Sequence, residues 1–233
     1  MLSKSPCALR KEFPLMNAAE APVEIWNRRY ATEDRENRIK YERWLDRWVD
    51  LLHGHKGRAL DLGCGPGFDS SFLLGLGFDV TALDHSKVAV AISEQKNPTA
   101  THLVADIRHL REAVRGQFSV IVANLSLHYF NRIETESIFS AISQLLVEGG
   151  FFAFRVNAYD EQGAPADRSS WDLITVESMP KQFFDERKIA HLLGHSLDLV
   201  SIEKRTTDRF GRRKSLFEVA ALKRTARDER SLK

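Results

Sequence analysis

A glycine-rich loop between a predicted strand and a predicted helix constrains this chain more than any other segment. Residues 58–62 (Arg-Ala-Leu-Asp-Leu) are typical of a short buried strand, and the loop 63–67 (Gly-Cys-Gly-Pro-Gly) leads into a predicted helix over 68–75. Glycine tolerates positive φ and lets a ligand approach the backbone, while the first turn of a helix offers free N–H groups. The segment therefore predicts a ligand site at this loop.

The spacing of the glycines separates classes of ligand. The fingerprint for a dinucleotide pyrophosphate is G-x-G-x-x-G, whereas here the third glycine, Gly67, comes one residue early and Phe68 takes its place. The loop also lacks the Lys-Ser/Thr pair that a P-loop requires. The spacing therefore favours a nucleoside ligand without a pyrophosphate over NAD.

Acidic residues at strand ends are suitably placed to bind such a nucleoside. Asp84 follows a predicted strand over 80–83, where a carboxylate can accept hydrogen bonds from both ribose hydroxyls. Asp106 follows a predicted strand over 103–105, where a carboxylate could accept a hydrogen bond from the exocyclic amine of adenine. Asp61 could meet an ammonium group of the ligand or brace the loop. Asp84 and Asp106 could instead be helix caps or turn residues.

The remaining pattern alternates strands with helices, which indicates an α/β protein with a parallel sheet covered on both faces. Two β-type runs, 197–205 and 213–221 around Gly211, predict a closing antiparallel hairpin. Residues 157–182 predict a long functional loop or lid. The other expected strands are 118–123 and 151–156, and the other expected helices are 34–53, 86–95 capped by Ser86, 133–147 stopped by Gly149-Gly150, and 185–194 from an Asp185 cap to Gly194.

Length and composition suit one such domain. The chain has 233 residues, with 43% hydrophobic and 28% charged, and we expect a domain over 23–222 between an N-terminal arm (1–22) and a disordered tail (223–233). Its apolar runs are too short for a membrane span, and its first residues lack a secretory signal, so we expect a cytoplasmic protein. With Cys7 and Cys64 alone, we expect neither disulfides nor a metal.

The glycine and acid motifs carry a resemblance. Asp61-x-Gly63-x-Gly65-x-Gly67, Asp84, Asp106, and Asn124 after the fourth strand resemble the cofactor motifs of class I S-adenosylmethionine-dependent methyltransferases, over roughly residues 26–222. The resemblance implies a Rossmann-like three-layer sandwich, whose seven-stranded, mostly parallel sheet ends in a C-terminal antiparallel hairpin. It also implies S-adenosylmethionine across the strand carboxyl ends. The expected cofactor-binding residues are Trp26, Tyr30, Asp61, Gly63, Cys64, Gly65, Gly67, Asp84, His85, Asp106, Ile107 and Asn124.

A narrower resemblance concerns the acceptor. Residues 26–30, 126–130, 150–157 and 183–185 resemble bacterial small-molecule methyltransferases of the tellurite-resistance type, whereas 158–180 depart from the glycine-rich, aromatic loop of that type. The resemblance implies methyl transfer to a small-molecule acceptor by in-line displacement. The sequence specifies neither the acceptor nor the oligomeric state.

Three residues are candidates for a catalytic role. His128 and Tyr129 follow the strand 118–123, beside the expected methyl group, and we hypothesise that His128 orients or deprotonates the acceptor. The alternative is a hydrogen-bonded structural histidine. Arg155 lies in an apolar strand, and because an unpaired buried charge is costly, it should meet a protein carboxylate or an anionic substrate. Cys64 is expected to be a small side chain beneath the cofactor and not a nucleophile.

Two other function classes fit parts of the sequence. The basic stretch 204–214 could track the phosphates of RNA, but a net charge of +2 is weak support, and a solvated face is the better explanation of the stretch. We therefore expect no nucleic-acid partner. A cofactor-binding subunit without activity could use 157–182 for docking.

Overall fold

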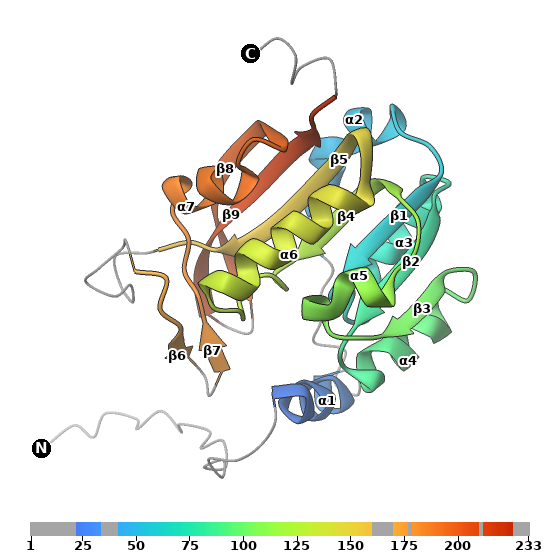
Figure 1. Cartoon of the computed structure of the whole chain (residues 1–233). Helices are drawn as coiled ribbons and strands as arrows, with labels where there is room; N and C mark the ends of the chain where they lie inside the picture. The colour runs from blue at the N-terminus through green and yellow to red at the C-terminus, as the bar shows by residue number, and fades with distance from the viewer. Residues whose placement is uncertain (1–21, 34–41, 160–169, 177–178, 210–211, 226–233) are drawn as a thin grey trace, which may run out of the picture.

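A seven-stranded sheet forms the centre of the molecule in the computed structural model, which describes residues 22–33, 42–159, 170–176, 179–209 and 212–225. The strand order is β3-β2-β1-β4-β5-β9-β8 (Figure 1). The strands are β1 (Arg58–Leu62), β2 (Asp79–Asp84), β3 (Thr101–Val104), β4 (Phe118–Asn124), β5 (Leu146–Asn157), β8 (Leu197–Arg209) and β9 (Arg212–Lys223).

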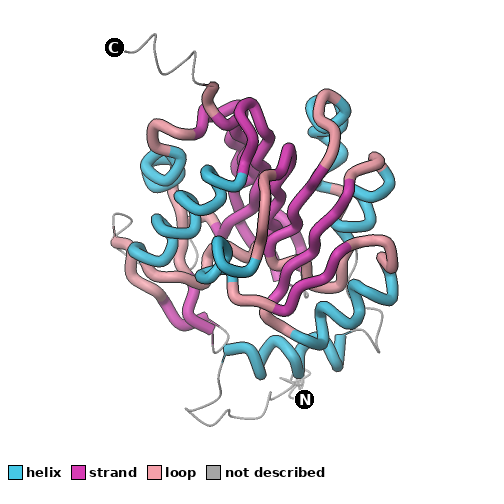
Figure 2. Tube along the Cα trace, turned by 45° about the vertical axis from the view of Figure 1, so that its right-hand side comes forward, coloured by secondary structure: helices cyan, strands magenta, loops and turns pink. Residues whose placement is uncertain are grey.

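The first five strands are parallel, and the last two close the sheet in the opposite sense. β9 runs antiparallel to β5, and β8 runs antiparallel to β9. The predicted Rossmann-like architecture with its C-terminal hairpin is therefore confirmed. β4 is buried along almost its whole length, as expected of a central parallel strand that helices cover on both faces (Figure 2). The carboxyl ends of β1 to β5 consequently meet at one edge of the sheet.

Helices pack on both faces, and their caps follow the local sequence. The Ser86 side chain accepts a hydrogen bond from the Ala89 amide, and the Asp185 side chain accepts one from the Lys188 amide, so both predicted caps are confirmed. Within the described residues, none of the helices has the length and apolar character that a membrane crossing requires. The helices are α1 (Pro22–Glu33), η2 (Trp44–Trp48), α2 (Val49–His53), α3 (Phe68–Gly75), α4 (Lys87–Lys96), η3 (Ile107–His109), α5 (Leu110–Ala113), α6 (Arg132–Leu145) and α7 (Glu186–Leu193), where η denotes a 3-10 helix.

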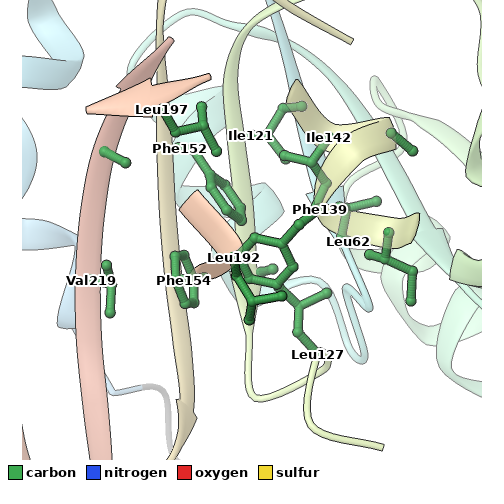
Figure 3. Packing of buried hydrophobic residues seen from close by; sticks show 14 of the residues in the cluster. Leu62, Ile121, Leu127, Phe139, Ile142, Phe152, Phe154, Leu192, Leu197 and Val219 are labelled. Atoms are coloured by element: carbon green, nitrogen blue, oxygen red, sulfur yellow. The ribbon is translucent and has the colours of Figure 1, made fainter. Parts of the chain in front are cut away.

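Two apolar cores, one on each face, hold these layers together. On one face, Phe139 of α6 meets the ring of Phe154 edge-on, with ring centroids 5.3 Å apart, and Phe152 stacks on Phe154 at 4.8 Å (Figure 3). Each aromatic pair of this kind stabilises the fold by about 0.5–1.5 kcal/mol beyond its buried area. On the other face, Trp44 and Trp48 pack with α3 against β1 and β4.

The structure corrects several predicted element bounds. In place of the helix predicted over 34–53, residues 44–53 form a 3-10 helix followed by a short α-helix. The tighter 3-10 turn still buries the apolar stripe of Trp44, Leu45 and Trp48. Residues 34–41 lie outside the described residues. Gly149-Gly150 do not stop α6, which ends at Leu145. They lie in an irregular part of β5, between the residues that pair with Phe118 and Val120.

Further differences concern the ends and the predicted lid. α1 was not predicted, and it begins at Pro22, within the expected arm. Lys223 belongs to β9, and its Nζ donates to the Ser143 hydroxyl at 2.7 Å, so the ordered sheet reaches into the expected tail. The predicted loop 157–182 contains a small hairpin of β6 (Ile174–Val176) and β7 (Met179–Lys181), and its residues 160–169 and 177–178 lie outside the described residues. Gly211, around which the C-terminal hairpin was predicted, also lies outside them.

We predict that Gly67→Ala destabilises the fold more than Gly77→Ala. Both glycines have positive φ, 77° and 87°, so alanine strains either turn by about 1–2 kcal/mol. At Gly67 an added Cβ would also lie 2.3 Å from Ser93 Oγ and 2.5 Å from Asn97 Nδ2, whereas nothing lies within 4 Å of one at Gly77. Urea unfolding should therefore show a further loss of about 1–3 kcal/mol at Gly67. Equal losses would contradict the tight packing of the loop against α4.

Candidate functional site

A cavity of about 710 Å³ opens at the carboxyl ends of the parallel strands. Its walls come from the segments that follow β1, β2, β3 and β4, from α1, and from the two hairpins β6–β7 and β8–β9. Small-molecule sites typically occupy about 300–1,000 Å³, and open α/β sheets bind ligands at this edge. The cavity is therefore the candidate functional site.

The structure divides the predicted site residues, all of which it describes, into two groups. The first group lines the cavity and consists of Trp26, Tyr30, Gly63, Asp84, His85, Asp106, Ile107, Asn124, His128 and Tyr129. The second group lies behind the wall and consists of Asp61, Cys64, Gly65, Gly67 and Arg155. Residues of the second group do not line the cavity, so they can affect a ligand only by positioning the residues that do.

Asp84 fixes the glycine loop and presents its carboxylate to the cavity. It is 5% exposed; its Oδ2 accepts from the Gly65 amide at 2.9 Å, and its Oδ1 accepts from the Ser86 amide at 2.8 Å. Each carboxylate oxygen has a further lone pair, so the group can also accept hydrogen bonds from a ligand. The cavity side of Asp84 thus suits the two hydroxyls of a ribose.

Gly63 brings backbone to the cavity wall where a side chain would not fit. Its φ is 71°, and an added Cβ would lie 2.3 Å from the Cβ of Ser126 in the segment after β4. The amides of Gly63 and Cys64 both donate to the Leu83 carbonyl, at 2.7 and 3.0 Å. The loop is therefore anchored to β2 on one side and meets the segment after β4 on the other.

A buried polar network braces the loop from behind. Asp61 is 1% exposed and accepts a hydrogen bond from the Ser70 hydroxyl at 2.6 Å. Asp69 accepts one from Trp44 Nε1 and one from Asn124 Nδ2, each at 2.9 Å. Burial raises the pKa of Asp61 well above its ordinary value, and the negative charge of Asp69 adds to this. The contacts of Asp61 fit the bracing role among its two predicted roles.

Asp106 reaches the cavity together with an arginine that sequence reasoning missed. Its Oδ2 accepts from Arg108 Nη2 at 2.7 Å, and Arg108 Nη1 reaches Glu134 at 3.1 Å. Partial burial acts to raise the pKa of Asp106, but the hydrogen bonds and charge of Arg108 outweigh it, and the pKa is lowered. Any contact of Asp106 with an adenine amine therefore involves an ionised carboxylate that also binds Arg108.

Aromatic rings link α1 to the segment after β4. Trp26 stacks on Tyr30 with centroids 5.5 Å apart and meets Tyr129 edge-on at 5.6 Å, and Tyr129 lies 4.3 Å from the ring of His128. His128 is 2% exposed, and its carbonyl accepts from the Gln182 amide at 2.7 Å. These contacts place the predicted acceptor-side residues at the cavity wall, next to the β6–β7 hairpin.

The structure corrects the placement of Arg155 among the catalytic candidates. Arg155 is 3% exposed, lies outside the cavity lining, and forms ion pairs with Glu42 and Glu218. Among the described residues, this network contains three arginines and three glutamates, which are Arg47, Arg155, Arg205, Glu42, Glu203 and Glu218. Of the two predicted partners of Arg155, the protein carboxylate is the one present.

Sequence reasoning also missed the cavity residues of the two hairpins. Met179, Pro180 and Lys181 come from β7, while Thr207, Lys214 and Leu216 come from β8 and β9. Lys214 was noticed only as part of a basic stretch. No local pattern indicates that these hairpins fold over the sheet edge, because their position depends on packing between distant segments.

Comparisons with known proteins agree with this geometry. Residues 59–150 match the family model described as a methyltransferase domain. The malonyl-(acyl-carrier protein) O-methyltransferase of Enterobacter lignolyticus is 28% identical over 132 residues, which are 57% of this chain and 51% of that protein. The chain spans about half the length of the first curated relatives it matches.

Solved structures extend the likeness to most of the chain. TehB from Haemophilus influenzae matches with a TM-score of 0.64 at 18% identity, over 83% of this chain and 65% of TehB. The 1,6-didemethyltoxoflavin-N1-methyltransferase of Burkholderia thailandensis matches with a TM-score of 0.63 at 20% identity, over 91% of this chain and 94% of that one. At these identities the likeness shows the fold.

The fold and the matched segment point to the same class of protein. The architecture is that of the class I S-adenosylmethionine-dependent methyltransferases, which confirms the resemblance carried by the glycine and acid motifs. The matched residues 59–150 run from β1 into β5 and include the glycine loop, Asp84, Asp106 and Asn124.

We predict that Arg155→Met destabilises the protein without weakening its affinity for S-adenosylhomocysteine. The change breaks the ion pairs of the buried Arg155 with Glu42 and Glu218, and loss of one partner of a buried pair costs about 3–5 kcal/mol. The control is Arg43→Met, whose side chain is 75% exposed in its pair with Asp46 and should matter by about 0–1 kcal/mol. Urea unfolding and calorimetric titration measure the two effects. Unchanged stability with lost affinity would return Arg155 to the ligand site.

Proposed function

We propose that this protein uses S-adenosylmethionine to methylate a small-molecule acceptor bound in the cavity. The observation that carries the proposal is the carboxylate of Asp84, which two backbone amides hold at the cavity wall beside the open backbone of Gly63. That arrangement, inside a matched methyltransferase domain, fits a nucleoside with free ribose hydroxyls.

Different residues at the cavity wall would bind different parts of the nucleoside. Asp84 would accept the ribose hydroxyls, and Ile107 and Asp106 would border the adenine. Gly63 would contact the amino-acid portion, and Trp26 and Tyr30 of α1 would cover it. When bound, S-adenosylmethionine would supply a methyl carbon on a positively charged sulfur. The acceptor lone pair would form a bond to that carbon in line with the carbon–sulfur bond, which breaks and leaves S-adenosylhomocysteine.

The part of the cavity that holds the acceptor must orient the nucleophile and exclude water. His128 and Tyr129 form that wall, and His128 is almost fully buried. An anionic acceptor needs no base. A neutral N–H, O–H or S–H acceptor loses a proton, and the His128 ring is the group placed to take it.

The small-molecule acceptor is favoured over the alternatives by the position of the basic residues. In the stretch 204–214, Arg205 pairs with Glu203 at 2.7 Å, and Lys214 lines the cavity. These two side chains face a carboxylate and the cavity, whereas RNA binding requires cations aligned along an open surface. The toxoflavin-type neighbour is named for methylation of a small molecule, which supports the same acceptor class. Release of S-adenosylhomocysteine by the purified chain in an acceptor screen would exclude a subunit without activity.

We predict that S-adenosylhomocysteine binds the purified protein and that NAD does not. At 100 times its Kd, a ligand of the folded state adds about 2.7 kcal/mol to the free energy of unfolding. Asp84→Asn removes the charge that faces the ribose and should weaken binding by at least tenfold, about 1.4 kcal/mol. Asp79→Asn, at the exposed start of the same strand, is the matched control. Calorimetric titration that finds no S-adenosylhomocysteine binding, or an unaffected Asp84 variant, would reject the proposal.

A further inference from the structure

Arg108 is a charged side chain of the cavity wall that has no role in the proposed function. It lies in η3, two residues after Asp106, and both side chains belong to the cavity lining. The Ala105 amide donates to the Asp84 carbonyl at 3.0 Å, which ties this segment to the end of β2. Ile107, between the two charged residues, lines the same cavity. The guanidinium is therefore next to the place where the proposed function puts the adenine.

The guanidinium of Arg108 binds the Asp106 carboxylate with several hydrogen bonds. Its Nη2 donates to Asp106 Oδ2 at 2.7 Å, and its Nε lies 3.1 Å from both carboxylate oxygens. The backbone amide of Arg108 also donates to Oδ1, at 2.9 Å. Because a planar guanidinium and a planar carboxylate make charge-assisted bonds in a fixed geometry, this contact sets the orientation of the carboxylate as well as its charge.

A second carboxylate, on a different element, holds Arg108 itself. Arg108 Nη1 donates to Glu134 Oε1 at 3.1 Å, and Glu134 belongs to the first turn of α6. Glu134 is fixed in turn by a capping box, in which its Oε2 accepts from the Asn131 amide and its own amide donates to Asn131 Oδ1, each at 3.0 Å. The orientation of Asp106 therefore depends on contacts that reach from η3 to α6.

The contacts with Arg108 leave Asp106 able to accept a further hydrogen bond. A carboxylate has about four acceptor positions, and the three donors of Arg108 occupy about three of them. The Asp106 side chain is 31% exposed and lines the cavity, so a ligand can reach it. A ligand N–H would find an acceptor there, whereas a ligand carbonyl oxygen would meet negative charge.

The exposure of Arg108 separates a role in ligand binding from a role in folding. Its side chain is 49% exposed. Ion pairs at that exposure usually add little to folding stability, because water screens them and long side chains lose entropy in forming them. A loss of ligand affinity on removal of Arg108 therefore cannot be ascribed to a loss of fold, provided that unfolding is measured beside it.

Charged groups on several elements face the Asp106 carboxylate. Partial burial acts to raise the pKa of Asp106, but the hydrogen bonds and charge of Arg108 outweigh it and the pKa is lowered, with the charge of His85 acting in the same direction. His85 follows β2 and lies 3.4 Å from Asp84, and Glu134 faces Asp106 through Arg108. Removal of the Arg108 side chain leaves the effect of burial opposed more weakly, so the pKa of Asp106 should rise.

We propose that Arg108 is a positioning residue for the methyl donor, which holds Asp106 as an oriented anionic acceptor for the exocyclic amine of the adenine. This inference rests on the proposed function and deepens it, because it names the residue that prepares Asp106 for the nucleoside. Arg108 acts through Asp106 and takes no part in the transfer of the methyl group.

Calorimetric titration of the full chain with S-adenosylhomocysteine at pH 7.5 tests the proposal. We expect Arg108→Met to weaken binding at least about fivefold, which corresponds to the loss of one hydrogen bond. Arg108→Lys keeps the charge without the planar geometry and should weaken binding less. The control Arg132→Met breaks an ion pair of similar exposure, with Glu136, outside the cavity lining, and should leave the affinity within about twofold. Equal affinity of Arg108→Met and the parent protein would overturn the proposal.

A double-mutant cycle tests whether Arg108 acts through Asp106. Asp106→Asn should itself weaken the binding of S-adenosylhomocysteine, and in that background Arg108→Met should add a loss of less than about twofold. Urea unfolding of Arg108→Met should resemble that of Arg132→Met. Losses of affinity that simply add in the double variant, or a fold that is much less stable in Arg108→Met than in Arg132→Met, would contradict the positioning role.

The pH profile of binding separates positioning from a merely structural contact. Because the pKa of Asp106 is lowered, its carboxylate stays ionised in the parent protein as the pH falls from 7.5 to 4.5, whereas in Arg108→Met it begins to take up a proton. Over this range the affinity of Arg108→Met should fall at least about twofold more than that of the parent, while Arg108→Lys should follow the parent. His85 can change charge in every variant, so the difference from the parent is what counts. Parallel profiles of Arg108→Met and the parent would overturn the proposal.

The same preparations separate this inference from the proposed function. Failure of S-adenosylhomocysteine to bind the parent protein rejects the proposed function and the inference with it. Binding that depends on Asp84 but not on Arg108 rejects the inference alone.

Discussion

The hydrogen bonds of the Asp84 carboxylate to the Gly65 and Ser86 amides are the interaction on which the candidate site depends. One side chain thereby joins the loop after β1 to the first turn of α4. Hydrogen bonds from backbone amides to a carboxylate are charge-assisted and stronger than neutral ones. Because the same carboxylate forms part of the cavity wall, the contact that fixes the loop also fixes a ligand-binding group.

Much of the fold could be predicted because its signals are local. Strands such as β4 are buried on both faces, so their apolar runs stand out, and the caps Ser86 and Asp185 act within a single turn. The glycine loop was also recognisable, since Gly63 and Gly67 lie where the backbone has positive φ and neighbouring side chains leave no room for a Cβ. These features need no knowledge of distant contacts.

The rest depends on packing between segments far apart in the sequence. The apolar strand around Arg155 correctly predicted a buried charge that needs a partner. The partners, Glu42 and Glu218, are 113 and 63 positions away in the sequence, and no pattern links them to Arg155. Lys181 and Lys214 likewise reach one cavity from two hairpins whose positions follow from sheet order and register. The cavity residues that follow β1 to β4 were thus largely predictable from sequence, and those of the two hairpins were not.

In the function that we propose, the cavity holds the methyl donor and the methyl acceptor at different places. The lining with Asp84 and Asp106 suits a nucleoside that bears hydroxyls and an amine, and the lining from His128, Tyr129 and the two hairpins would hold the acceptor. This separation orients donor and acceptor, which is the main contribution a protein makes to such a displacement.

A crystal structure of the protein grown with S-adenosylhomocysteine is the most direct test of where that cofactor product binds. Our account predicts both ribose hydroxyls within hydrogen-bond distance of Asp84, the adenine beside Ile107, and the sulfur facing His128 and Tyr129. A nucleoside bound elsewhere, with Asp84 bonded only to Gly65 and Ser86, would contradict it.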